Sequence, residues 1–302
     1  MRASVHAGPL GRLNKRATME YRETAAPAAL ERHVQCWWRL RDPTPSGAPQ
    51  TIYPDGRCEL IVHRAQPMQI RTPTGWRAQG RCLFAAQSRS AIRLRATGPL
   101  DCVGVRLRPE ASAALFSAAL QETTALASLA DQVLDLRVLD EPFARALTEC
   151  LGGGADPPAP AFVRLLSERL GTRSIDAQVA AAVTALDRAH GNLGVRALAT
   201  ELCISVRSLQ GRFLAAVGLT VKEYALVQRL QATIRQLDGG AAALAETAIE
   251  MGFADQAHAT RALRAFAGMT PARLRSALAA QRDGDQTLAM AAAFVRGESL
   301  PS

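Results

Sequence analysis

Hydrophobic and polar residues alternate with a period of two through much of the first half of the chain. Apolar residues occupy every second position in 92–96 and again in 103–107, and Gly98-Pro99 lies between the two runs. Alternation on both sides of a turn signal predicts a β-hairpin with one buried face. Shorter strand-like runs occur at 33–40, 58–63, 68–71 and 81–86.

Helical patterns first appear late in the first half of the chain and then dominate the second half. Helical stretches are expected at 110–120 and 125–139, after Pro109. Between 224 and 237, apolar residues recur every three or four positions, as an amphipathic helix requires. Thr220, followed three residues later by Glu223, forms a capping box at its start. Thr270-Pro271 marks the start of the last helix in the same way.

These patterns predict an α+β protein of two domains. Residues 152–160 are rich in Gly and Pro and can hold neither a helix nor a central strand. We expect a mostly antiparallel β domain or barrel with helices, and then an all-α domain. We expect a disordered arm at 1–18, unless translation begins at Met19. The predicted boundaries then place the β domain at 19–150, a linker with a short helix at 151–173, the all-α domain at 174–281 and a flexible tail at 282–302.

One helical unit occurs twice in the predicted all-α domain. The first copy runs from Ala199 to Val221 and the second from Ala248 to Pro271. Each predicts a short helix, a tight turn at Cys203 or Gly252, and a second helix that begins at a capping residue. This is the helix-turn-helix plan, in which the second helix enters the major groove of DNA. The amphipathic helix of 224–237 joins the two units.

The details of the second copy resemble a known family. The likeness rests on Ile249-Glu-Met-Gly-Phe253-Ala-Asp-Gln-Ala-His258, then Arg261, Gly268-Met-Thr-Pro271 and Arg275. With them, residues 176–278 resemble the DNA-binding domain of the AraC/XylS transcription regulators. The resemblance implies that both recognition helices face adjacent major-groove segments of one double-stranded DNA. Two residues depart from the family pattern. Gly211 stands where an arginine is common, and Ala259 where an aromatic residue packs.

The predicted recognition helices carry residue types suited to reading DNA. Arg and Gln can bond guanine and adenine edges in pairs, and Ala can meet a thymine methyl group. Ser and Arg near a helix start more often hold phosphates. The candidate DNA-binding residues are Arg207, Ser208, Gln210, Arg212, Gln256, Ala257, His258, Thr260 and Arg261. For His258, capping of the helix is the alternative, and Cys203 is expected to be a packing residue.

The first domain also resembles a sensor-like domain, of unassigned function, that precedes such DNA-binding domains. Tyr53-Pro-Asp-Gly56 and Val103–Pro109 carry much of this likeness. It implies a small-molecule effector or a homodimer contact, and RNA polymerase as a partner if the protein activates. The candidate effector-pocket residues are Trp37, Trp38, Asp55 and Arg106. Adjacent tryptophans on a strand should face opposite ways, one into the core. Asp55-Gly56 is first expected to form a turn, with a ligand role as the alternative. A solvated outer face is expected to carry Arg106 with Arg93, Arg95 and Arg108, and an anion pocket is the alternative.

Composition and charge narrow the function further. The net charge is +9, but only +3 falls in 176–280, from 11 basic and 8 acidic residues. Charge therefore permits DNA binding without establishing it. No apolar run is long enough to span a membrane, and the N-terminus has no signal-peptide core, which favours the cytoplasm. We expect no cofactor and no metal site.

Two other functions remain open from the residues. An enzyme fused to a DNA-binding module is one, because some relatives repair alkylated DNA through a cysteine. Here the candidates would be Cys36, Cys58, Cys82 and Cys102, but their spacing forms no local cluster. The other is a module that acts through protein contacts alone, which Gly211 and Ala259 favour. We expect a regulator and not an enzyme.

Overall fold

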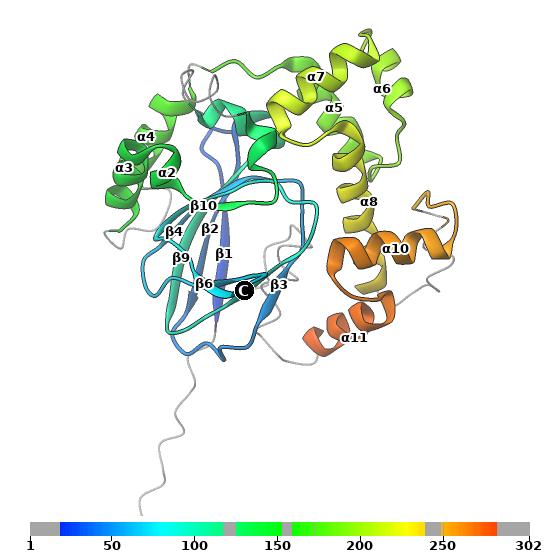
Figure 1. The fold of residues 1–302 in the computed structure, drawn as a ribbon. Helices are drawn as coiled ribbons and strands as arrows, with labels where there is room; N and C mark the ends of the chain where they lie inside the picture. Colours follow the sequence, from blue (N-terminus) through cyan, green and yellow to red (C-terminus); the bar gives the residue numbers. More distant parts are fainter. Residues whose placement is uncertain are drawn as a thin grey trace, which may run out of the picture.

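The computed structural model describes residues 19–116, 125–152, 159–171, 173–238, 249 and 251–282. The predicted arm at 1–18 and nearly all of the predicted tail at 282–302 lie outside these residues. Strands fill the first part of the chain and helices the last, so the α+β fold class is confirmed (Figure 1). None of the described helices combines the length and hydrophobicity that a membrane crossing needs.

The strands form two separate sheets in the described part of the chain, and every pair is antiparallel. The larger sheet has the order β1-β2-β9-β4-β7-β10 and the smaller has the order β3-β8-β5-β6. The strands are β1 (Glu20–Ala25), β2 (Val34–Asp42), β3 (Gln50–Ile52), β4 (Glu59–His63), β5 (Gln69–Thr72), β6 (Gly75–Ala78), β7 (Cys82–Ala85), β8 (Ile92–Arg95), β9 (Leu100–Leu107) and β10 (Val133–Asp135).

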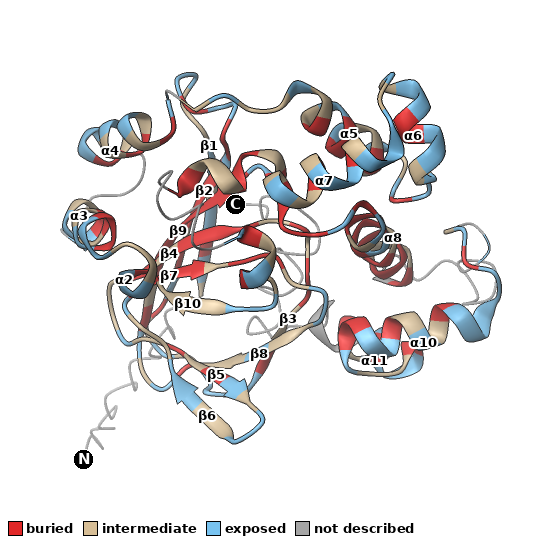
Figure 2. Cartoon of the chain, turned by 45° about the horizontal axis from the view of Figure 1, so that its top comes forward, coloured by how far each residue is buried: buried red, intermediate tan, exposed pale blue. Residues whose placement is uncertain are grey.

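The larger sheet is covered on both faces. Helical segments pack on its outer face, over a core that includes Trp37, Phe84 and Val105. The smaller sheet faces its inner side, where Trp38 and Met68 belong to a second core. The covering segments are the 3-10 helices η1 (Pro109–Leu115) and η2 (Leu126–Leu129) and the α-helices α2 (Leu136–Leu139), α3 (Glu141–Gly152) and α4 (Pro160–Leu170). The domain is therefore built in three layers (Figure 2).

The predicted hairpin between 92–96 and 103–107 is wrong. Both segments are strands, but β8 pairs with β3 and β5 in the smaller sheet, whereas β9 pairs with β2 and β4 in the larger one. The turn at Gly98-Pro99 thus carries the chain from one sheet to the other. Alternation identified the strands, but it holds no information about which strands pair.

The two stretches predicted as helices after Pro109 also have structures that differ from the prediction. The first is the 3-10 helix η1, and residues 117–120 of the prediction lie outside the described part. The second, 125–139, contains η2, strand β10 and the short helix α2. Strand β10 completes the edge of the larger sheet beside β7, so tertiary pairing overrides the local helical pattern.

The segment predicted as a linker with a short helix includes a structural part of the β domain. Helix α4 lies within it, and Phe162, Leu166 and Leu170 of α4 are buried in the same core as Trp37. The rings of Trp37 and Phe162 meet edge to face at 4.7 Å. Residues 153–158 of the predicted linker lie outside the described part. We propose that the first domain extends to Leu170.

The second domain is helical throughout its described part. Its helices are α5 (Ala177–Arg188), α6 (Val195–Glu201), α7 (Val206–Val217), α8 (Val221–Asp238), α10 (Gln256–Ala267) and α11 (Pro271–Arg282). The predicted capping box is confirmed: the Thr220 backbone N donates to Glu223 Oε2 at 2.8 Å, and Glu223 N donates to Thr220 Oγ1 at 3.2 Å. Buried residues of α8 join both ends of the domain into one core.

Candidate nucleic-acid interface

The first helix-turn-helix unit consists of α6, a tight turn and α7. Ser205 caps α7 by accepting a hydrogen bond from the Ser208 backbone at 3.1 Å, and Gly218 ends it in the left-handed region. Cys203 lies in the turn with φ of +54°, a conformation that costs a non-glycine residue energy. Its side chain is exposed, so the expectation that Cys203 is a packing residue is wrong.

The four candidate DNA-contacting residues of α7 differ in their surroundings. Arg207 and Gln210 are exposed and Ser208 is half-buried. Arg212 points back into its own domain, where it bonds both oxygens of Asp176 at 2.6 Å and also the side chain of Gln178. These bonds hold the pKa of Asp176 below its ordinary value. Since Asp176 caps α5, Arg212 ties α7 to the start of α5.

The second unit presents α10 in the equivalent place. Its preceding helix, predicted around Ala248, lies almost wholly outside the described residues. Gly252 stands in the turn with φ of +72°, and Asp255 caps α10 by accepting from the His258 backbone at 2.6 Å. The side chains of Gln256, Ala257, His258 and Arg261 are exposed, and that of Thr260 is half-buried.

His258 contributes to the turn as well as to the exposed surface. Its ring lies edge to face against Phe253, with centroids 5.4 Å apart, and its Nδ1 accepts a 3.4 Å hydrogen bond from the Ala254 backbone. The capping alternative for His258 therefore has structural support. Behind the helix, Ala259 is fully buried, and Leu263 and Phe266 fill the same core. The small residue at this position is thus a core residue of the second unit.

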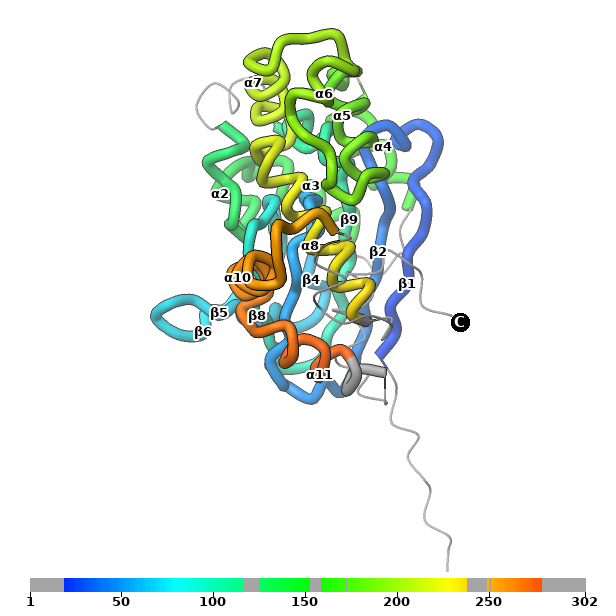
Figure 3. The backbone as a smooth tube through the Cα atoms, turned by 90° about the vertical axis from the view of Figure 1, so that its right-hand side faces the viewer, coloured from blue at the N-terminus to red at the C-terminus, as the bar shows by residue number. Residues whose placement is uncertain are grey.

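The two domains are joined through a loop of the β domain, Tyr53–Arg57. Arg57 donates to the Tyr224 hydroxyl at 2.5 Å and to Asp187 Oδ2 at 2.8 Å. Burial opposes the charge of Arg57, but Tyr224 and Asp187 outweigh it and raise its pKa. Gln228 and Gln231 of α8 donate to the backbone oxygens of Asp55 and Pro54. Helix α8 therefore runs along the β domain (Figure 3).

Gly56 permits this close approach. It has φ of +78°, and a Cβ atom there would lie 2.8 Å from Tyr224 and Gln228. The predicted turn at Asp55-Gly56 is present, but it is also a contact with the DNA-binding domain. Arg57 and Asp187 were not among the sequence-predicted residues. A lone arginine after a turn gives no signal that its partner lies 130 residues away.

Helix α7 is covered along one side by the β domain. It packs against η1 and η2, and Gly218 lies against Leu126, where a Cβ would come within 2.9 Å of Cγ. Gly211, Leu214 and Ala215 line a groove of about 400 Å³ between α7 and these 3-10 helices. The missing side chain at Gly211 thus opens a groove between the domains.

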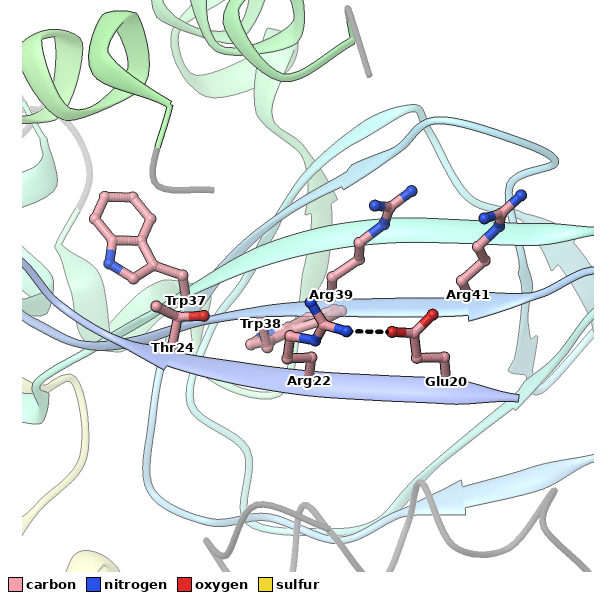
Figure 4. A pocket seen from close by; sticks show the side chains of 7 residues that line it. All are labelled: Glu20, Arg22, Thr24, Trp37, Trp38, Arg39 and Arg41. Atoms are coloured by element: carbon pink, nitrogen blue, oxygen red, sulfur yellow. Dashed lines mark hydrogen bonds and ion pairs between the residues drawn. The ribbon is translucent and has the colours of Figure 1, made fainter. Parts of the chain in front are cut away.

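The four candidate effector-pocket residues lie on opposite sides of the larger sheet. Trp37 lies in the core beneath α4, whereas Trp38 lies on the inner face. There Glu59 accepts hydrogen bonds from both Trp38 and Arg106, and Arg106 is 3.6 Å from Asp55. The tryptophans do face opposite ways, but both are buried, because both faces are covered. A hollow across β1 and β2, lined by Glu20, Arg22, Arg39, Arg41 and parts of both tryptophans, lies at the domain surface (Figure 4).

The expectation of a solvated outer face for Arg106 is wrong. Its side chain is 2% exposed, on the inner face of the larger sheet. It bonds Glu59 Oε1 at 2.9 Å, and its guanidinium lies 3.3 Å from Glu23 and 3.6 Å from Asp55. The alternation had placed Arg106 opposite a buried face correctly, but the smaller sheet covers that side too.

A cavity between the two sheets brings several of these groups together. Its apolar part, about 100 Å³, is lined by Trp38, Met68 and Leu94, together with His63 and Glu59. Burial raises the pKa of Glu59 to about 7 although Arg106 opposes the shift, and burial lowers the pKa of His63 to about 4. Glu59 and His63 were not among the predicted site residues, because a strand of ordinary β composition gives no sign of a cavity beside it.

The four cysteines considered for alkyl transfer do not form a reactive site. All are buried, and burial raises the pKa of Cys36, Cys58 and Cys102 to about 12 and that of Cys82 to about 11. They are therefore protonated at neutral pH, whereas the nucleophilic form is the thiolate. Within the described residues, no three His, Cys, Asp or Glu side chains are grouped as a metal site would require.

Comparison with known families decides the nature of the helical domain. Residues 198–277 match a family model described as a helix-turn-helix domain. This is an AraC-type DNA-binding domain. Residues 22–127 match a domain of unknown function, DUF6597. A search of curated proteins found no match.

Solved structures of AraC-like regulators share a distant likeness with the whole chain. ToxT from Vibrio cholerae has a TM-score of 0.40 at 8% identity, covering 86% of this chain and 98% of ToxT. A fatty-acid-bound ToxT gives 0.38 at 9%, covering 76% and 91%. The AraC-like activator CuxR gives 0.25 at 14%, covering 74% and 87%. The AraC-type domain makes the chain a DNA-binding transcription regulator.

Proposed function

We propose that this regulator reads two adjacent major-groove segments of one DNA duplex under the control of its β domain. The length of α8 supports the first part. It has 18 residues, and at about 1.5 Å per residue it is roughly 27 Å long. Successive major-groove segments on one face of DNA are about 34 Å apart. A rigid helix of this length suits two units that bind one helical turn apart.

The exposed ends of α7 and α10 supply the contacts in this proposal. Arg207 and Gln210 on the first helix, and Gln256 and Arg261 on the second, are the base-reading candidates. Ser208, Ala257, His258 and Thr260 complete the proposed surface. Arg212 has a weaker claim, because its guanidinium is already bonded to Asp176 and Gln178.

The contacts between the domains support control by the β domain. Arg57 links it to α5 and α8, and η1 and η2 cover one side of α7. A change in the β domain can therefore alter the access of α7 to DNA. We place this activity in the cytoplasm, with a small-molecule effector as the controlling signal.

Selection from random duplex DNA at physiological salt tests the DNA-reading proposal. The full chain should recover two conserved blocks about 10 base pairs apart, centre to centre. Recovery of one block would contradict a two-segment reader, and recovery of none would contradict sequence-specific binding. A chain that carries Arg207→Ala should lose conservation in one block only, and Arg261→Ala in the other, which assigns each helix to its half-site.

A further inference from the structure

The cavity between the sheets continues to the domain interface. Beside its apolar part lies a second hollow of about 70 Å³, lined by Tyr53, Asp55 and Arg57. Glu59, Ile52 and Ile92 line both hollows, so Glu59 stands at the junction between them. The outer hollow carries more polar groups than the inner one, among them Asp55 and Arg57, and part of its wall is the loop that contacts α8.

Negative charge is in excess around this junction. Arg106 and Arg57 face four carboxylates, those of Glu59, Glu23, Asp55 and Asp187. Arg57 is bonded across the domain interface to Asp187 and is also close to Asp55, whereas Arg106 faces Glu59, Glu23 and Asp55. Buried charge is costly unless it is paired. The junction is therefore suited to a positively charged group.

The apolar hollow supplies the rest of the binding site. Trp38, Leu40, Met68 and Leu94 form its walls, and hydrocarbon would be desolvated there. His63, 3% exposed, also lines this hollow, and burial lowers its pKa, so its ring is uncharged beside the hydrocarbon.

Size limits the occupant further. A cavity of roughly 150 Å³ accommodates benzene. The two hollows, of about 100 and 70 Å³, together slightly exceed that volume. We propose that this cavity binds a small apolar amine, with its ammonium group at Glu59 and its hydrocarbon part between the sheets. The inference rests on the proposed effector control, for which it names the class of ligand.

Anions and sugars fit this site less well. A carboxylate would lie beside Glu59 and Asp55, which repel it. A sugar would leave most of its hydroxyl groups against Trp38 and the other apolar walls without hydrogen-bond partners, and each such group is costly.

Calorimetry on the DNA-free full chain tests the proposal with three ligands that share one phenyl body. They are 2-phenylethylamine, 2-phenylethanol and phenylacetate, which carry a cationic, a neutral and an anionic head. The amine should bind about tenfold more tightly than the alcohol, as a charge-assisted bond to Glu59 implies, and phenylacetate should bind most weakly. Equal affinities, tightest binding of phenylacetate, or no binding by any of the three would overturn the proposal.

Variants locate the binding. Glu59→Gln should reduce the affinity for the amine to that for the alcohol, whereas Glu31→Gln, at an exposed carboxylate, should change neither. Glu59→Gln also removes a partner of Arg106 and can impair folding. Ile92→Phe gives a second test, because it narrows the junction without touching the ion pairs. It should weaken the binding of both the amine and the alcohol, and unchanged binding would place the ligand elsewhere.

The outcome is separable from that of the DNA selection. Amine binding without recovery of a DNA motif would reject the proposed two-segment reading of DNA and leave the cavity proposal standing. Recovery of a two-block motif with no amine binding would support the two-segment reading and reject the cavity proposal.

Discussion

The two recognition helices occupy different environments although they come from the same repeated unit. Helix α7 packs along one side against η1 and η2 of the β domain, and Gly218 at its end touches Leu126. Helix α10 packs mainly on α8 and α11 and meets the β domain at its far end, where Ala91 donates to the Phe266 backbone oxygen at 2.7 Å. Helix α7 is thus packed against the β domain along one side, whereas α10 contacts it near its C-terminal end.

One arginine on each helix shows a second difference. Arg212 on α7 is bonded to Asp176 and Gln178 of its own domain, whereas Arg261 on α10 is exposed, as Arg207 on α7 is. A repeat in sequence therefore does not make two equal contact surfaces. The packing of η1 and η2 on α7 supports the proposal that the β domain influences the first half-site more than the second.

The largest effect should come from removing the Arg57 link between the β domain and helices α5 and α8. Arg57→Met removes the bonds to Asp187 and Tyr224, so the Asp187 carboxylate keeps the 2.7 Å hydrogen bond from the Tyr224 hydroxyl but loses the charge of Arg57. Removing one partner of a buried ion pair costs about 3–5 kcal/mol, and the 32% exposure of Asp187 places this case near about 3 kcal/mol. Calorimetric unfolding of the full chain should separate into two transitions as the domains uncouple.

A second arginine of the β domain provides the control for this experiment. Arg89 also reaches across to the DNA-binding domain, 3.3 Å from Glu223, but the two side chains are 45% and 34% exposed, more than those of Arg57 and Asp187. Arg89→Met should cost less than about 1 kcal/mol. If the two variants lost equal stability, Arg57 would have no special role in the interface.

A smaller effect is expected when Arg261 and Arg212 are each replaced by alanine. Arg261→Ala should weaken binding by roughly 1–3 kcal/mol if Arg261 reads a base, with little change in unfolding. Arg212→Ala should mainly lower stability, since it loses bonds to Asp176. Fluorescence anisotropy with the selected DNA and urea unfolding measure the two quantities. A larger loss of affinity for Arg212→Ala would reverse the assignment of their roles.

The smallest effect concerns two glycines of α7. Among the described residues, no atom outside the helix's own backbone lies within 4 Å of a Cβ built at Gly211, so Gly211→Ala should stabilise the helix by up to about 1 kcal/mol. Gly218 has φ of +84° and touches Leu126, so Gly218→Ala should destabilise by about 1–2 kcal/mol. Urea unfolding should show opposite signs. Destabilisation by both would mean that Gly211 is needed in the groove.

The parts of the structure that local rules control could be predicted from the sequence. Ser205 and Thr220 follow capping rules that act over three residues, and the capping box at Thr220 is present as predicted. The positions of several strands could be predicted for the same reason, because alternation is a local pattern. Their pairing could not, because β8 and β9 are separated by one turn yet belong to different sheets.

The ligand cavity and the domain interface depended on contacts that no local pattern contains. Arg106 was expected in solvent, since alternation assumes one covered face, and the smaller sheet covers the second. Glu59 and Arg57 act through partners 47 and 130 residues away. The candidate DNA-binding residues lie on or beside exposed helix ends, and their contacts with bases stay predictions.

The five-residue loop Tyr53–Arg57 lies between the proposed ligand cavity and α8, the helix that joins the two DNA-binding units. Its side chains line the hollow beside Glu59, and its carbonyl oxygens hold α8. Thermodynamic linkage is reciprocal for two such sites. A ligand that raises the affinity for DNA tenfold is itself bound tenfold more tightly when DNA is present, a coupling of about 1.4 kcal/mol. The promoter would then act as an effector of the ligand site.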